Sequence, residues 1–270
     1  VEGNLPSERQ RDITDIQGLW KEDAWPARVA KVISLLEYVR GVPRTERNIA
    51  ALLYDSLEAG SPLTEVERAI GLLADNQFIR QTEDGWKMLT AQEKNWTTER
   101  DSLSPTPKER RDIWEDMLHA IFTEPGLSRY QYQKRTFTLG VSWDNRTLTQ
   151  GEIPIELKIS DEPTIYGADC VKVRSLSREK GKDHVVFWAF SANNETDNLV
   201  IELYRSRQMV AKYEQLRAQN KITPDESASL ANEKLDVSRR EERLKRLIME
   251  VIEKGTGFFD GVSQPGAELG

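Results

Sequence analysis

The stretch from Ala24 to Thr90 restricts the possible folds more than any other part of this chain. It carries three successive runs of apolar residues at helical spacing. Two β-type runs, 78–82 and 86–90, then flank an Asp-Gly pair, which is a strong signal for a tight hairpin. Three helices followed by a hairpin is the element order of a winged helix, so the sequence predicts that fold here. The apolar positions are Val29, Val32, Ile33, Leu36 and Val39, then Ile49, Leu52, Leu53 and Leu57, then Val66, Ile70 and Leu73.

Local capping signals predict where these helices begin and end. Proline suits the first helical turn, so Trp25-Pro26 opens the first helix, and Gly41 closes it. Thr45 is the expected N-cap of a second helix over 46–57. Thr64 with Glu67 predicts a capping box at the start of the third helix.

The chain is long enough for more than one domain. Residues 1–22 are polar, so we expect a tail or linker there, and Ser104-Pro105-Thr106-Pro107 marks a domain boundary. The expected organisation is a tail over 1–22, a winged-helix domain with a trailing helix over 23–104, and a mixed α/β domain over 105–270. The fold class is therefore α+β, with a small sheet and a long helical hairpin in the second domain.

Apolar patterns predict the strands of the second domain. Residues 136–143 and 153–159 alternate apolar and polar side chains, which is typical of half-buried strands. Residues 185–190 are continuously apolar, which predicts a strand buried on both faces. We expect shorter strands at Val171 to Val173 and at Phe258-Phe259, the latter at a sheet edge.

Three helices complete the second domain. One begins after Thr106, and two long helices begin near Thr196 and Thr223, each with a hydroxyl residue as the expected N-cap. The two long helices run to about residues 219 and 254, with a short connection between them. They are predicted to form an antiparallel hairpin.

Composition excludes several classes of protein. No apolar run approaches the roughly 20 residues needed to span a bilayer, so no membrane partner is expected. With a single cysteine and no secretory leader, we expect a cytoplasmic protein. The missing initial methionine suggests a piece of a longer polypeptide. Because the net charge of −7 repels phosphates overall, DNA binding requires a local basic face.

Sequence signatures of catalysis are missing. A P-loop needs a glycine-rich turn with a lysine and a hydroxyl residue, and a dinucleotide site needs G-x-G-x-x-G after a strand; neither is present. His119, His184 and Cys170 do not form a zinc-binding spacing. We interpret His119 as a helix-surface residue and assign no role to His184. The sequence therefore predicts no catalytic, cofactor-binding or metal-binding residue.

In a DNA-binding winged helix, the third helix reads the major groove and the wing contacts phosphate. Here Arg68 is the only cation on that helix, and the wing offers Arg80 and Lys87. Carboxylates on the same surfaces repel phosphate, so protein contact or scaffolding is favoured, with direct base readout as the alternative. These carboxylates are Glu65, Glu67 and Asp75 on the helix and Glu83 and Asp84 on the wing.

A second candidate surface is the segment 129–135, RYQYQKR, in which basic and aromatic residues are interleaved. Its tyrosines could stack on bases while its cations grip a nucleic-acid backbone. The segment also fits the start of a strand that packs its tyrosines, and we favour this structural interpretation because tyrosine is common on half-buried strands. The residues with a weak nucleic-acid signal are therefore Arg68, Arg80, Lys87, Arg129, Lys134 and Arg135.

Several stretches together form a recognisable pattern: VISLLEYVR at 32–40, TERNIA at 45–50, GWKMLT at 85–90 and RTF at 135–137. This pattern resembles an internal region of the BrxC family, called PglY in related systems. Members of this family are large P-loop ATPases of bacterial BREX bacteriophage-exclusion defence. The resemblance extends over most of the chain as an order of helix, wing and strand, without a catalytic signature.

The resemblance implies a part in restricting phage DNA within a complex that contains a methyltransferase and other BREX subunits. The family's ATPase motif has no counterpart here, so ATP and magnesium are implied for the parent protein only. The implied role of this region is to recruit partner subunits, sister copies or DNA. Two other classes stay open: a winged-helix DNA-binding regulator, and an enzyme whose site is built from residues that we place at the surface.

Overall fold

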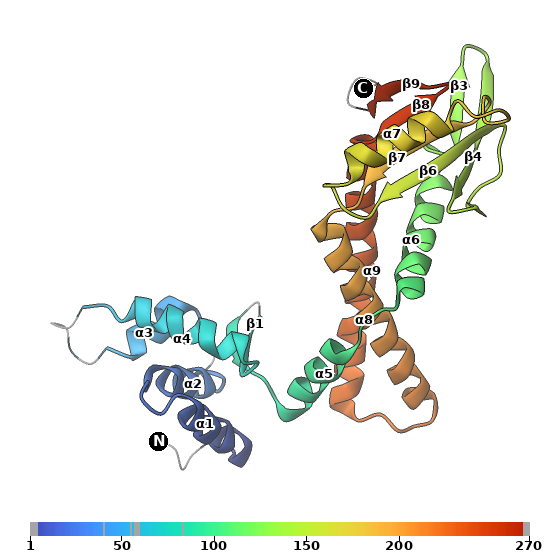
Figure 1. The fold of residues 1–270 in the computed structure, drawn as a ribbon. Coiled ribbons are helices and arrows are strands. Elements are labelled where there is room, and N and C mark those ends of the chain that lie inside the picture. Colours follow the sequence, from blue (N-terminus) through green and yellow to red (C-terminus); the bar gives the residue numbers. More distant parts are fainter. Residues whose placement is uncertain (1–4, 40, 55, 57–59, 83, 267–270) are drawn as a thin grey trace. The chain divides into compact units, whose positions relative to one another are not determined.

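The computed structural model describes residues 5–39, 41–54, 56, 60–82 and 84–266 of an α+β chain (Figure 1). The chain divides into two compact units, Val1–Glu99 and Arg100–Gly270. The division falls inside helix α5, Ala91–Ser102, a few residues before the boundary expected after residue 104. Each unit is described by itself below.

The described residues of unit 1 form four helices and a two-stranded hairpin, followed by the start of α5. The helices are α1 (Ser7–Leu19), α2 (Trp25–Leu36), α3 (Glu46–Leu52) and α4 (Leu63–Asp75), and the strands are β1 (Ile79–Thr82) and β2 (Gly85–Met88). The three helices and the hairpin expected over 24–90 are therefore present, in the expected order.

The tail expected over 1–22 contains helix α1 instead. Ile13 and Ile16, one helical turn apart, are buried, and α1 packs against α2. The Arg9 guanidinium is also buried and donates to the Leu89 and Met88 carbonyls at 2.7 and 3.1 Å. The buried side of this otherwise polar helix thus consists of two isoleucines together with the paired Arg9 and Asp12.

Helix ends in unit 1 differ from the capping signals at two places. The predicted capping box of Thr64 with Glu67 is wrong, because α4 begins at Leu63 with Pro62 at the N-cap, so Thr64 is already helical. Helix α3 ends at Leu52, and the Leu57 position lies outside the described residues. Thr45 does cap α3, since its hydroxyl accepts from the Asn48 amide at 3.3 Å.

The hairpin of unit 1 also contacts the segment that precedes α3. Gly85 has a φ of +91°, and a Cβ there would lie 2.4 Å from the Arg44 carbonyl oxygen, so a side chain does not fit. Arg44 forms an isolated parallel bridge with Gly85, and its amide donates to the Asp84 carbonyl at 2.8 Å. The Trp86 amide donates back to the Arg44 carbonyl at 2.9 Å. A third short extended segment thus lies along the hairpin.

Unit 2 is built on one sheet with the strand order β3-β4-β6-β7-β8-β9, and β5 pairs with β4. The central strands β4, β6 and β7 are parallel, and the outer pairs are antiparallel. The strands are β3 (Arg129–Tyr132), β4 (Arg135–Trp143), β5 (Arg146–Thr147), β6 (Ile153–Ser160), β7 (Val186–Ser191), β8 (Thr256–Phe259) and β9 (Val262–Pro265).

Helices cover both faces of this sheet. Helices α6 (Pro107–Phe122), α8 (Asn194–Ala218) and α9 (Pro224–Glu253) share one core with β4, β6 and β7, and α8 and α9 form the expected long hairpin (Figure 1). Helix α7 (Tyr166–Leu176) packs on Phe187, Ala189 and Phe258 in a second core. The prediction that 185–190 is a strand buried on both faces is confirmed.

Three local predictions for unit 2 are wrong. Val171 and Val173 lie in helix α7, where Val173 is buried and Val171 is 67% exposed; a spacing of two puts both valines on one face of a strand but on opposite sides of a helix. The N-cap of α8 is Asn193, and Thr196 is its capping-box partner three residues later. Strand β8 pairs with β7 on one side and β9 on the other, so the Phe258-Phe259 strand is not at an edge.

Candidate functional site

The cation of helix α4 is paired within unit 1. The Arg68 guanidinium lies 2.8 Å from the Asp23 carboxylate and 3.0 Å from that of Glu65. The hydrogen bond from Arg68 is the main cause that lowers the pKa of Asp23 below its ordinary value. Helix α4 therefore presents no free cation to a phosphate.

The two wing cations converge on one carboxylate. Arg80 and Lys87 lie 2.8 and 3.4 Å from the same oxygen of Glu93, at the start of α5. Burial alone would raise the pKa of Glu93, but the Thr90 amide and the two cations outweigh it and lower this pKa. The Glu93 carboxylate therefore offsets part of the positive charge of both wing cations.

The other three candidate cations stand on the β3–β4 hairpin of unit 2. Arg129, Lys134 and Arg135 are exposed, and within the described chain none of them lies in an ion pair. Tyr130 and Tyr132 are 53% and 58% exposed, so the expectation that this strand packs its tyrosines is wrong. The physical reason is that β3 is an edge strand, and the helices that cover the sheet pack on its central strands.

The register of this hairpin sorts its side chains onto two faces. Tyr130 is opposite Phe137 and Tyr132 is opposite Arg135, and directly opposed residues of an antiparallel pair share a face. Both tyrosines and Arg135 are therefore on one face. Arg129, two residues from Gln131, is on the other.

Carboxylates are scarce around the hairpin. Asp and Glu make up 45 of the 270 residues, or one in six, yet none occurs between Glu124 and Asp144. At the base of the hairpin, the Glu152 carboxylate accepts from the Thr138 amide at 3.2 Å. The tip of the hairpin is thus a local positive region in an acidic chain.

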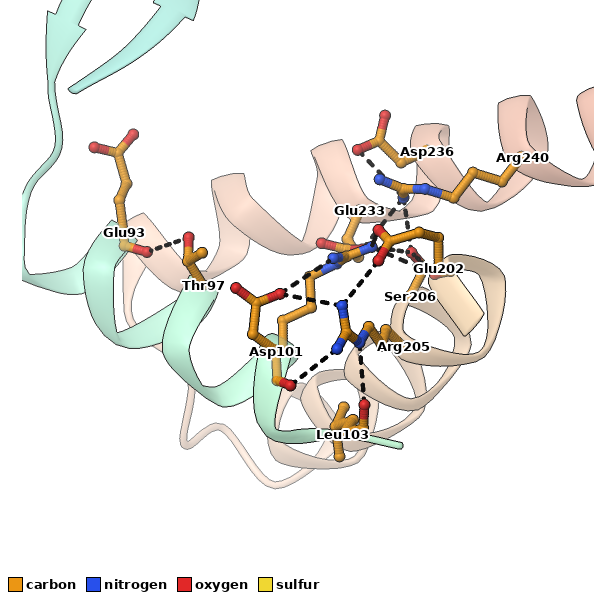
Figure 2. Close-up of polar contacts among 11 residues, drawn as sticks. Glu93, Thr97, Asp101, Leu103, Glu202, Arg205, Ser206, Glu233, Asp236 and Arg240 are labelled. Atoms are coloured by element: carbon orange, nitrogen blue, oxygen red, sulfur yellow. Dashed lines mark hydrogen bonds and ion pairs between the residues drawn. The ribbon is translucent and has the colours of Figure 1, made fainter. Parts of the chain in front are cut away.

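A buried polar cluster joins the end of α5 to α8 and α9 within unit 2 (Figure 2). Arg100, whose side chain is 12% exposed, lies 2.6 Å from the Glu202 carboxylate and 3.0 Å from that of Glu233. Arg240 donates to the Ser206 hydroxyl at 2.7 Å and lies 3.5 Å from Glu233. The arginines and carboxylates of this cluster neutralise one another, so the cluster stabilises the contact between the end of α5, α8 and α9. No local sequence pattern indicates this cluster, because Arg100 is more than 100 residues from both Glu202 and Glu233.

A hollow of about 320 Å³ lies at the carboxyl ends of the parallel strands of unit 2. Trp143 at the end of β4, Asp161 after β6 and Asp197 in α8 line it, together with Arg110 and Arg111 from α6. Burial raises the pKa of Asp197, with an opposing effect of Arg110. The two signs of charge are balanced in this hollow, so it does not select an anionic or a cationic ligand.

The residues considered for metal binding or catalysis lie apart from one another. His119 is exposed on α6, His184 is exposed in the loop before β7, and Cys170 is half-buried in α7. Across the described residues, no group of three or more His, Cys, Asp or Glu side chains is placed to hold a metal ion. None of the helices in the described part of the chain is both long and apolar enough to cross a membrane.

Comparisons with known proteins give no further assignment. No protein family, no curated protein and no solved structure matches this chain.

Proposed function

We propose that this chain is a non-catalytic interaction region of a BREX phage-defence ATPase of the BrxC/PglY type, and that unit 1 is a winged-helix module. It works in the cytoplasm and recruits partner subunits or DNA during bacteriophage exclusion. ATP and magnesium are bound elsewhere in the parent protein. The family part of this proposal is supported by the sequence pattern over 32–40, 45–50, 85–90 and 135–137.

The winged-helix part is supported by the order of α2, α3, α4 and the β1–β2 hairpin. The segment between α2 and α3 also contacts this hairpin, because Arg44 forms an isolated parallel bridge with Gly85. The chain order is the observation that favours a winged helix over an unrelated helical bundle with a hairpin.

One observation favours protein recruitment over duplex reading by unit 1: its candidate cations are held by internal carboxylates. Arg68 is paired with Asp23 and Glu65, and the wing cations share Glu93. Phosphate contacts supply most of the affinity of duplex binding, so cations occupied in this way contribute little to it. A surface of balanced charge suits a protein partner better.

Affinity capture tests the recruitment role. The immobilised 270-residue chain is incubated with each purified BREX subunit and with a second copy of itself. We expect retention of at least one of these proteins. If none of them is retained at concentrations up to about 10 μM, which corresponds to a binding free energy of roughly −7 kcal/mol, the proposal is wrong.

Duplex binding by the wing is the second candidate function, and gel-shift titrations with duplex DNA separate it from the first. Under our proposal, Arg80→Glu with Lys87→Glu leaves duplex affinity unchanged. Glu93→Gln removes the carboxylate that occupies both cations, and so tests whether the freed wing binds duplex. A loss with the first variant and a gain with the second would instead establish a DNA-binding wing.

A further inference from the structure

The β3–β4 hairpin exposes two aromatic rings that its own fold does not use. Tyr130 and Tyr132 are on one face, about 7 Å apart along the strand, given ~3.4 Å per residue. Neither belongs to the buried cores of unit 2, although aromatic side chains usually bury most of their surface. Rings spaced in this way on an open sheet face can each receive an unstacked base.

The cations of the hairpin complement those rings. Arg135 is on the tyrosine face, opposite Tyr132, Lys134 is in the turn, and Arg129 is on the other face of β3. With no acidic residue between Glu124 and Asp144, these charges are not cancelled along the strand. At the base of the hairpin, the Glu152 carboxylate accepts from the amide of Thr138, the residue directly opposite Arg129, so among the residues that the structure describes the part of the hairpin without a carboxylate partner is its tip, at Lys134 and Arg135.

The exposed rings and cations of the hairpin together fit one class of binding partner. An acidic peptide would satisfy the cations but would leave both tyrosine faces without a partner. Duplex DNA keeps its bases stacked inside, so the rings would again have nothing to stack on. A single strand supplies phosphates and unstacked bases together, and so matches every exposed feature of the hairpin.

We propose that the β3–β4 hairpin is a binding site for single-stranded nucleic acid, with Tyr130 and Tyr132 stacking on two bases and Arg129, Lys134 and Arg135 contacting the backbone. The site rests on the DNA-recruiting part of the proposed function and specifies which nucleic acid is bound, but its observations do not depend on the family assignment. If the hairpin does not bind single strands, recruitment of partner subunits is not contradicted, because capture of those subunits is measured separately.

Fluorescence anisotropy with the whole chain tests the site. Labelled 15-residue oligo-dT and oligo-U are titrated at about 50 and 200 mM salt, alongside a duplex of the same length. We expect both single strands to bind more tightly than the duplex, because only they offer free bases. Equal affinity for the two indicates recognition of bases and phosphates alone, and tighter binding of oligo-U indicates an added 2′-hydroxyl contact; both results support the proposal.

Variants separate stacking from charge. Tyr130→Ala and Tyr132→Ala should each weaken binding about tenfold, in line with roughly 1–3 kcal/mol per stacked base, whereas Tyr→Phe at either position should retain it. Replacing Arg129, Lys134 and Arg135 with glutamine should lower the slope of log affinity against log salt by about 2, at roughly 0.7 per phosphate contact. Circular dichroism checks that each variant is folded.

Tyr38, which is 65% exposed in unit 1, provides the matched control, and Tyr38→Ala should leave affinity unchanged. Three outcomes would overturn the proposal: no single-strand binding at 50 mM salt, binding that both tyrosine variants leave intact, or tighter binding of the duplex. Displacement of the oligonucleotide by poly-glutamate, combined with indifference to the tyrosine variants, would assign the hairpin to an acidic protein instead.

Discussion

At the scale of single residues, Arg100 shows how a largely buried charge is accommodated, since its side chain is only 12% exposed. Removing its charge from water is costly, and that cost is offset only because two carboxylates accept from its guanidinium. Burial alone would lower the pKa of Arg100, but Glu202 and Glu233 outweigh it and raise this pKa. The side chain therefore stays charged, and Glu233, itself 6% exposed, depends on it.

We expect Arg100→Met to lower the free energy of unfolding of unit 2 by about 3 kcal/mol, because it leaves Glu233 buried with less compensation. Urea-dependent hydrogen exchange of α8 and α9 peptides measures the change. Arg239→Met on α9 is the control, since Arg239 is 78% exposed and its ion pair should contribute less than about 0.5 kcal/mol. Equal losses of stability from the two substitutions would show that the buried cluster stabilises unit 2 no more than an exposed ion pair does.

Acid should weaken the same cluster through Glu202. Burial alone would raise the pKa of Glu202, but hydrogen bonds and charge from Arg100 and Arg205 outweigh it and hold this pKa below its ordinary value of 4.5. A lowered folded-state pKa stabilises the protein above pH 4.5, and this contribution is lost as the pH falls through the folded value. Glu202→Gln should therefore be less stable than the parent at pH 7, and the difference should shrink below pH 4.5. A difference that stays constant down to pH 3 would contradict this.

At the scale of elements, helix starts in unit 2 depend on short side-chain motifs. The Asn193 side chain accepts from the Thr196 amide at 2.9 Å, and the Thr196 hydroxyl reaches back to the Asn193 amide at 3.0 Å. We expect Asn193→Ala to cost about 1 kcal/mol, and Asn194→Ala, one residue into the helix, to change stability by less than about 0.5 kcal/mol. Thermal denaturation of both variants measures this. A larger loss with Asn194→Ala would show that α8 is capped differently.

Element positions were predictable where a periodic apolar pattern was long. Helix α2 and strands β4 and β6 follow such patterns, whereas the α8–α9 hairpin was expected from helix starts near Thr196 and Thr223. Short segments misled: the spacing of Val171 and Val173 suits a strand although the segment is helical, and helix α1 shows only two buried isoleucines among polar residues. Whether such a segment becomes a helix or a strand depends on the element that packs on its apolar side chains. A local sequence pattern does not show which element that is.

The candidate site was predictable only in part, for a similar reason. The sequence identifies Arg68, Arg80 and Lys87 as cations, but their pairing with Asp23 and Glu93 depends on contacts that follow from the fold. The exposure of Tyr130 and Tyr132 likewise depends on β3 being an edge strand, which strand order decides. The sequence shows which residue types are available for a surface. The fold decides which of their side chains are exposed and unpaired.

At the scale of the whole molecule, the two units have separate cores that share no residue. We expect two unfolding transitions in urea, one for each unit. Ile33→Ala in unit 1 and Ile248→Ala in unit 2 remove side chains that are fully buried, so each should lower its own transition by about 3 kcal/mol. Hydrogen exchange of peptides from α2 and α9 reports the two units separately. If one substitution shifted both transitions equally, the chain would unfold as a single cooperative body.

The sheet of unit 2 is closed by a strand that comes late in the chain. Strand β8 pairs with β7 only after the long α8–α9 hairpin has been made, some 65 residues after β7 ends at Ser191. Until the ribosome has released residues 256–259, the Phe187 edge of β7 has no neighbour on that side. Unpaired strand edges invite association with other chains. A polypeptide stalled within α9 would therefore offer other chains an unpaired β7 edge that the complete chain covers with β8.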